Sequence, residues 1–309
     1  KVAVIGDFAK TPRYQGAGSS LVNPAMPPES ILEEIKDSGL TMTAYEQGYI
    51  RNRKPNAKLV KAAVDAAKNA DVVLFFGGLD EISESEGLDR AHMHMPVAQD
   101  ELINELTTVN KNVIVVLSAG SSVEMLWYPY VKGIVHGYLG GQAGASAMLN
   151  VLTGKVCPSG KLNETYPLHY EDTPAYEYYP SKERSSEYRE GLYVGYRYYT
   201  TVGKKVRFPF GFGLSYTTFT YRDLAVDQDG VTFKIQNTGT VAGTEIAQLY
   251  VGKESDSVFR PLRELKGFAR VELAPGEEKE IRILFDDKTF RFYDTRTDSW
   301  EVETGTYQI

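Results

Sequence analysis

The sequence contains little cysteine and little histidine. Cys157 is the only cysteine among 309 residues, so an intramolecular disulfide is excluded, and a chain so poor in thiols fits a reducing compartment. We therefore expect a cytoplasmic location, although exported bacterial enzymes without disulfides share this feature. Of the four histidines, His92 and His94 have a spacing that suits a metal, but no carboxylate or cysteine is placed to complete the site. We predict no metal and no other cofactor.

Other absences narrow the class of protein. No apolar run approaches the length of a membrane span, and the net charge of -7 is opposite in sign to the basic footprint of proteins that bind nucleic acids or anionic membranes. The first apolar run, residues 1–5, is not followed by the G-x-G-x-x-G of a dinucleotide site, and no serine lies in a G-x-S-x-G motif. The sequence therefore predicts no nucleic-acid partner, no membrane partner and no dinucleotide.

The bulk composition is that of an ordinary globular protein. Hydrophobic residues make up 42% of the chain and charged residues 24%, and the length suffices for one medium domain and one small one. The chain begins at Lys1, without an initiator methionine and inside a predicted strand, and it ends in residues 305–309, which also have a strand pattern. We expect it to be a piece of a larger protein.

Residues 1–168 alternate short apolar runs with amphipathic segments. Predicted strands occupy residues 1–5, 41–45, 71–76, 113–117, 133–136 and 161–166, and predicted helices occupy residues 30–38, 56–69, 102–109 and 143–152. This alternation is typical of a mostly parallel sheet with helices on both faces. The predicted fold class of this domain is therefore an α/β sandwich.

The composition changes twice after this domain. Residues 169–218 are dense in tyrosine, and we interpret them as a linker packed on the α/β body. From residue 219 to 309, short alternating runs are separated by turn signals such as Asn237-Thr238-Gly239 and Pro275-Gly276. Strands at this spacing without helices predict an all-β sandwich.

An acidic loop, GGLDEISESEGLDR, follows the predicted strand at 71–76 and contains five carboxylates within ten residues. Such a run is usually a solvated face, yet the carboxyl ends of parallel strands are also the usual place for chemistry in α/β folds. Glu86 differs from its neighbours because Gly87 permits unusual backbone dihedrals, and Asp89 with Arg90 offers charge-assisted hydrogen bonds that would hold the loop. We interpret Glu86 as a held carboxylate and a candidate proton donor.

A glycine-rich loop follows the first predicted strand. Residues 13–20, RYQGAGSS, include Gly16, Gly18 and Ser19 but lack the Lys-Ser/Thr pair of a phosphate-binding P-loop. On the residues alone, a plain turn and a sugar-binding loop are equally good interpretations.

Several motifs together resemble family 3 glycoside hydrolases of the β-glucosidase type. In chain order they are SEGLDR, GSSVEMLW, YLGGQAG, PSGKLNETYP, EGLYVGYRYY and FPFGFGLSYTTF. They extend along nearly the whole chain in the order that the family has. The resemblance implies that the α/β sandwich is followed by the fibronectin type III-like domain that ends many of these enzymes.

The resemblance also implies roles for particular residues. The glutamate of the EG-x-DR loop is the general acid/base in that family, which corresponds to Glu86 here. The family's nucleophile is an aspartate in an SDW-type motif on a separate barrel domain, and this sequence has no such motif. The glycine-rich loop would then lie close to the active site, with Arg13 as a candidate to brace it. The implied partners are a β-glucoside or short β-glucan oligosaccharide and the barrel domain of the same parent protein.

Two alternatives remain open on the sequence. The chain fits a non-catalytic carbohydrate-binding or scaffold module that uses its tyrosines and glycine loops to hold sugars. Within the enzyme class, β-xylosidase or another exo-glycosidase specificity fits as well. Glycoside cleavage needs two carboxyl groups, so we expect the chain by itself to be inactive.

Overall fold

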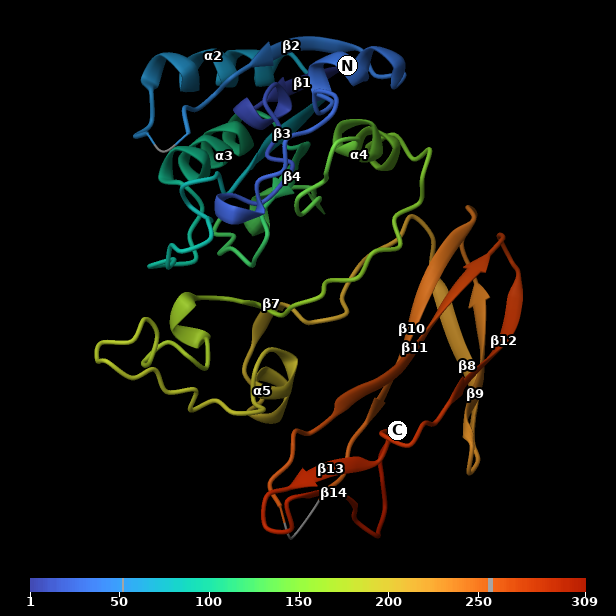
Figure 1. Ribbon diagram of the computed structural model, residues 1–309. Coiled ribbons are helices and arrows are strands. Elements are labelled where there is room, and N and C mark those ends of the chain that lie inside the picture. Colours follow the sequence, from blue (N-terminus) through green and yellow to red (C-terminus); the bar gives the residue numbers. More distant parts are fainter. Residues whose placement is uncertain (52, 255–257) are drawn as a thin grey trace. The chain divides into compact units, whose positions relative to one another are not determined.

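The computed structural model describes residues 1–51, 53–254 and 258–309, and the chain divides into two compact units (Figure 1). Unit 1 comprises Lys1–Val156 and Leu168–Tyr170, and unit 2 comprises Cys157–Pro167 and Glu171–Ile309. The domain limits that we place at residues 168 and 218 stay predictions.

Unit 1 is built on a five-stranded sheet. Its strands are β1 (Val2–Ile5), β2 (Met42–Glu46), β3 (Val72–Gly78), β4 (Val113–Ser118) and β5 (Gly133–His136), in the order β2-β1-β3-β4-β5. Every neighbouring pair is parallel. All residues of β1 are buried and nearly all of β3, as expected for parallel strands that are covered on both faces.

Helices cover both faces of this sheet (Figure 1). The helices are α1 (Ile31–Glu34), α2 (Ala57–Lys68), α3 (Val97–Val109) and α4 (Gly144–Leu152). On one face, Ile31 of α1 and Leu149 of α4 share a core with Val4, Leu74 and Val116 of the strands. Helices α2 and α3 contact each other and the opposite face. The predicted α/β sandwich is confirmed.

The helix starts follow from local capping. Asn56 caps α2, since its Oδ1 accepts hydrogen bonds from the N–H groups of Lys58 (3.0 Å) and Leu59 (3.3 Å). Ser30 caps α1, because its Oγ accepts from the Glu33 N–H at 3.3 Å, and the same hydroxyl donates to Glu33 Oε2 at 2.9 Å. Helix α1 is shorter than the predicted 30–38 and continues as a 3-10 turn, Ile35–Asp37.

One predicted strand is wrong. Residues 161–166 do not join the parallel sheet; only Tyr166 and Pro167 form a short strand, β6, which pairs antiparallel with β7 (Val206–Phe208) in unit 2. The N–H of Leu162 donates to the carbonyl of Phe212 at 2.8 Å, so this segment finds its backbone partners in the chain that follows β7. Pro167, which follows the predicted strand in the sequence, lies within β6.

Unit 2 ends in the predicted β-sandwich. Its strands are β8 (Phe219–Val226), β9 (Gly230–Asn237), β10 (Gly243–Val251), β11 (Glu264–Leu273) and β12 (Glu278–Leu284). They form the sheets β12-β9-β8 and β10-β11, and β13 (Arg291–Asp294) pairs with β14 (Ser299–Val302) in a hairpin. Phe233 and Ile235 of one sheet and Leu249 and Val271 of the other meet in one core. The all-β prediction is confirmed.

The tyrosine-rich segment carries one short helix, α5 (Tyr196–Thr201). Tyrosine rings of this segment stack on other aromatic rings of unit 2. Tyr193 stacks on Phe259 with 5.1 Å between ring centres, and Tyr196 stacks on Phe210 with 4.8 Å. That this segment packs on the α/β body stays a prediction.

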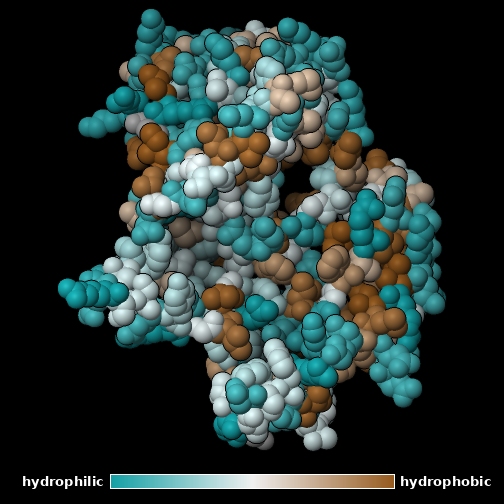
Figure 2. Space-filling model, in the orientation of Figure 1, coloured by the Kyte–Doolittle hydropathy of each residue, from teal (hydrophilic) through white to brown (hydrophobic). Residues whose placement is uncertain are grey.

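Hydrophobic residues remain exposed among hydrophilic ones on the face shown in Figure 2. In unit 2 the exposed hydrophobic side chains include Leu224, Phe268, Leu284 and Trp300. No helix of the described ranges combines the length and the apolar character needed to cross a membrane.

Candidate active site

Three loops meet at the carboxyl edge of the parallel sheet, because β1, β3 and β4 are direct neighbours in it. Glycines let the backbones approach closely there. A Cβ added to Gly6 would lie 2.0 Å from the carbonyl oxygen of Phe76, and one added to Gly78 would lie 1.9 Å from that of Ser118. Both glycines also have positive φ, so no other residue fits either position.

The end of β3 is fastened by a side chain of α3. Gln99 is fully buried, and its amide oxygen accepts from the Gly78 N–H at 2.7 Å while its amide nitrogen donates to the Gly78 carbonyl at 2.9 Å. The acidic loop therefore begins from a fixed point. No motif in the sequence pointed to Gln99.

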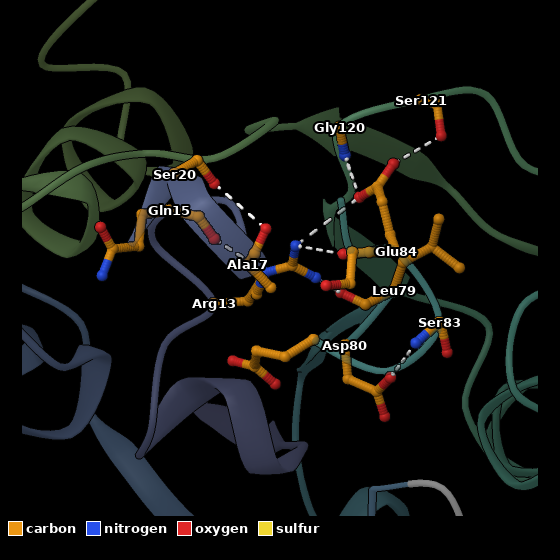
Figure 3. Close-up of polar contacts among 12 residues, drawn as sticks. Arg13, Gln15, Ala17, Ser20, Leu79, Asp80, Ser83, Glu84, Gly120 and Ser121 are labelled. Atoms are coloured by element: carbon orange, nitrogen blue, oxygen red, sulfur yellow. Dashed lines mark hydrogen bonds and ion pairs between the residues drawn. The ribbon is translucent and has the colours of Figure 1, made fainter. Parts of the chain in front are cut away.

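Arg13 links the glycine-rich loop to the acidic loop (Figure 3). Its side chain is buried, and its guanidinium donates to the carbonyl oxygens of Gln15 (2.9 Å), Leu79 (2.9 Å) and Glu84 (3.0 Å). A guanidinium has five fixed donors, which suits it to hold several carbonyls at once. This geometry supports the predicted role of Arg13 as a brace.

The carboxylate of Glu84 turns toward the loop after β4 (Figure 3). It accepts hydrogen bonds from the Gly120 N–H at 2.8 Å and from Ser121 Oγ at 2.5 Å, and Arg13 Nη2 lies 3.9 Å away. The sequence presented Glu84 only as one member of an acidic run. Its contacts depend on residues 36 and 37 positions later in the chain, so sequence reasoning missed them.

Glu86, a residue of the acidic loop, contacts the glycine-rich loop. Its Oε2 accepts from the Ser19 N–H at 2.8 Å, and its own N–H donates to the Ala17 carbonyl at 3.3 Å. Gly18 has a φ of 84°, and a Cβ there would lie 2.8 Å from the Cβ of Glu86. The structure thus brings Glu86, Gly18 and Ser19 together, while the Glu86 side chain stays exposed.

The remaining predicted residues surround this pair of loops. Gly16 lies next to Ser20, whose Oγ would be 2.5 Å from an added Cβ. Arg90 donates to Ser121 Oγ at 2.8 Å and to the Ser122 carbonyl at 3.0 Å, whereas Asp89 is exposed. Arg90 therefore fastens the far end of the acidic loop to the loop after β4.

A small cavity of about 50 Å³ lies beside Arg13 in unit 1, lined by Phe8, Phe76 and Met148 among others. Its volume suits one or two water molecules rather than a sugar ring. Among the described residues, Glu86 is not part of the lining of this cavity. Glu86 is exposed at the surface of unit 1.

A second polar cluster lies around the buried Glu124. Its Oε1 accepts from the Tyr170 N–H at 2.9 Å, and its Oε2 lies 3.5 Å from His94 Nδ1 and 3.6 Å from His169 Nδ1. The structure gives His94 a carboxylate neighbour that comes from a different loop. No group of three or more His, Cys, Asp or Glu side chains in the described ranges is arranged to hold a metal ion.

Asp100, which is buried, and His136, which is half-buried, have shifted pKa values in unit 1. Burial raises the pKa of Asp100 to about 7, with a smaller contribution from the nearby Glu124 charge, while a hydrogen bond from Trp127 Nε1 (2.9 Å) opposes the shift. Burial lowers the pKa of His136 to about 4, against a hydrogen bond to Leu117 and the charge of Glu84. His136 is therefore neutral at neutral pH and is not a proton donor there.

The arrangement presents an accessible carboxyl group, that of Glu86, which accepts a hydrogen bond from the glycine-rich loop. A carboxyl in this position can give or take a proton at a bound ligand. A retaining glycosidase also needs a second carboxyl roughly 5–5.5 Å from the first. Glu84 is the neighbouring carboxylate, but both of its oxygens already accept hydrogen bonds.

The fold and these loops define an α/β sandwich with a carboxylate-bearing edge, followed by a β-sandwich. Residues 1–216 match the glycosyl hydrolase family 3 C-terminal domain, and residues 245–309 match the fibronectin type III-like domain. The chain belongs to glycosyl hydrolase family 3, and the resemblance read from its motifs is confirmed.

Relatives match over the whole chain. Thermostable beta-glucosidase B of Acetivibrio thermocellus is 45% identical over 100% of this chain, and an exo-alpha-(1->6)-L-arabinopyranosidase of Bifidobacterium breve is 42% identical over 100%. The crystal structure of the GH3 beta-glucosidase of Bifidobacterium adolescentis superposes on 99% of the chain with a TM-score of 0.94 at 43% identity. The chain spans 42% of the length of the two relatives and 46% of the crystal structure's chain.

Proposed function

We propose that this chain is part of a retaining, exo-acting β-glucosidase in which Glu86 is the general acid/base. One observation carries the proposal: Glu86 is an exposed carboxylate of the EG-x-DR loop, and the Ser19 N–H holds it at 2.8 Å at the carboxyl edge of the sheet. The relatives named as β-glucosidases, similar over the whole chain, support the substrate class.

In the proposed reaction, protonated Glu86 gives its proton to the glycosidic oxygen as the bond from that oxygen to the anomeric carbon breaks. A second carboxylate forms a bond to the anomeric carbon at the same time. Glu86, now ionised, then takes a proton from water, whose oxygen attacks the anomeric carbon and releases that carboxylate. We propose that this second carboxylate is an aspartate on a barrel domain outside the chain, in keeping with the share of the relatives' length that the chain spans.

The experiment replaces Glu86 by Ala in the full-length protein and measures kcat/KM with two glucosides. Cellobiose has a poor leaving group, glucose, which needs the proton, so its kcat/KM should fall by about 10²–10⁴-fold. The dinitrophenolate of a dinitrophenyl glucoside leaves without a proton, so kcat/KM for that substrate should fall far less. Equal losses on both substrates would show that Glu86 is not the acid.

The 309-residue chain alone should release no nitrophenol from an aryl β-glucoside under conditions in which the full-length protein does. Turnover by the chain alone would contradict the proposal of an external nucleophile. Calorimetric titration of the chain with cellobiose tests the alternative of a sugar-binding module, which would bind without the rest of the protein.

A second specificity is favoured by a particular relative, the arabinopyranosidase that is 42% identical over the whole chain. A panel of aryl β-D-glucoside, α-L-arabinopyranoside and β-D-xyloside assayed with the full-length protein separates the three. Cytoplasmic location stays a proposal that rests on the single cysteine, and cell fractionation tests it.

A further inference from the structure

We propose that Glu84 and Ser121 are positioning residues that fix the orientation of Glu86. This inference rests on the proposed function, in which Glu86 donates the proton. It is carried by one feature of the acidic loop: the two ends of the segment that holds Glu86 are fastened to the same serine hydroxyl.

The fastening involves one side chain on each side of Glu86. Ser121 Oγ donates to Glu84 Oε1 at 2.5 Å and accepts from Arg90 Nη1 at 2.8 Å. Glu84 precedes Glu86 by two residues and Arg90 follows it by four, so the segment between them is closed into a loop. A hydroxyl is suited to this because it donates and accepts at once.

Glu84 is held at its main chain as well as at its side chain. Its N–H donates to the Asp80 carbonyl at 3.1 Å, and its own carbonyl accepts from Arg13 Nη2 at 3.0 Å. Its second carboxylate oxygen accepts from the Gly120 N–H at 2.8 Å, and an added Cβ on Gly120 would lie 3.1 Å from that oxygen. Glu84 therefore has little freedom to move, and neither has the chain that leads to Glu86.

A neighbouring acid provides a contrast within the same loop. The Glu81 side chain is 47% exposed and pairs with Arg51 at 3.1 Å, whereas the Glu84 side chain is 20% exposed. The partner of Glu81 is Arg51, which lies outside the segment from Glu84 to Arg90, so Glu81→Gln is the matched control for Glu84→Gln. Both substitutions remove one negative charge from the same loop.

The test uses the full-length protein with Ser121→Ala, Ser121→Thr, Glu84→Gln and Glu81→Gln. If the Glu86 carboxyl is misplaced, cleavage slows for a substrate whose leaving group needs a proton. Ser121→Ala and Glu84→Gln should therefore lower kcat/KM for cellobiose by about 10²-fold. With a dinitrophenyl glucoside the loss should stay within about threefold, because that leaving group needs no proton. Ser121→Thr keeps the hydroxyl and should retain activity on both substrates, as should Glu81→Gln.

Equal losses on the two glucosides, or no loss, would overturn the positioning role. If Glu84→Gln does not fold, as judged by its thermal unfolding, Ser121→Ala decides the question, since it removes a single hydroxyl. The Glu86→Ala result is independent of these variants. A selective loss with Glu86→Ala and none with Ser121→Ala would keep the proposed function and reject this inference alone.

Discussion

Both units hold turns with buried amides, but they differ in how far charged side chains take part. In unit 1 the loops at the sheet edge are joined by the buried Arg13 and by the ionisable Glu84, whereas in unit 2 a neutral amide, Asn237, does the corresponding work. Asn237 is fully buried; its oxygen accepts from Thr217 Oγ1 (2.6 Å), and its nitrogen donates to the Leu273 carbonyl (3.1 Å).

The buried charges follow the same division. Among the residues that the structure describes, the buried charged side chains of unit 1 are Arg13, Asp80, Asp100 and Glu124, and unit 2 has Asp294. Burying a charge costs more than burying an amide, so a neutral group suffices where only a turn has to be held. In unit 1 one of these costly groups, Arg13, holds the acidic loop that carries Glu86.

The largest expected effect is that of Arg13→Ala. It leaves the carbonyl oxygens of Leu79 and Glu84 without their donor, and we expect unit 1 to lose about 4 kcal/mol of unfolding free energy. Urea unfolding followed by Trp127 fluorescence measures this, because Trp127 is buried in unit 1 and the exposed Trp300 can be replaced by Phe. A loss below about 1 kcal/mol would contradict the bracing role.

The next largest loss of unfolding free energy is expected for Asn237→Ala, and this loss should affect unit 2 alone. It removes hydrogen bonds to the Val241 and Leu273 carbonyls and should cost about 3 kcal/mol. Hydrogen exchange of the strands β9 and β11 reports it. In the full-length protein the kcat/KM of folded Asn237→Ala should stay unchanged, whereas that of Arg13→Ala should fall; equal activity losses would break the comparison.

Asp100 should make unit 1 less stable as the pH rises from about 4 to about 7. In that window the native state keeps the proton while the unfolded state, with a pKa of 3.8, loses it. The destabilisation is therefore absent below pH 3.8 and complete above about 7. Asp100→Asn keeps an acceptor for Trp127 but cannot titrate, so its advantage over the natural chain should grow with pH; a constant difference would refute the shift.

The titration of His136 should have the opposite effect and make unit 1 less stable as the pH falls. Its native pKa of about 4 lies below the unfolded value of 6.5, so the unfolded state binds a proton first as the pH falls. This contribution to stability should be fully present above pH 6.5 and should be lost as the pH falls through 6.5 toward 4. In His136→Gln this part of the pH slope should be missing, as Trp127 fluorescence in urea would show.

The smallest effect is expected at the surface of unit 2. Arg222 donates to Glu278 Oε2 at 2.7 Å across strands β8 and β12, but both groups face solvent. Screening and side-chain entropy cancel most of the value of such a pair, so Arg222→Gln should leave the thermal unfolding of unit 2 unchanged. A clear fall in the unfolding temperature would show that surface pairs matter in this sandwich.

Much of the fold was predictable because its signals are local. Apolar runs of the right length predicted β1 to β5, and Asn56 and Ser30 marked helix starts. The segment 161–166 was not predictable in the same way. Its apolar pattern is like that of a strand in the parallel sheet, but its backbone partners come from residues 206–212. No local signal in the sequence indicates that pairing.

The sequence alone determined which residues were available at the sheet edge. It showed the acidic loop, the singular setting of Glu86 and the glycine-rich loop with Arg13. Only the tertiary structure decided which of them meet: that Ser19 binds Glu86, that Ser121 joins Glu84 to Arg90, and that Gln99 fastens β3. The physical reason is that hydrogen bonds act over about 3 Å, and parallel strand order, which short-range patterns do not encode, sets which loops come that close.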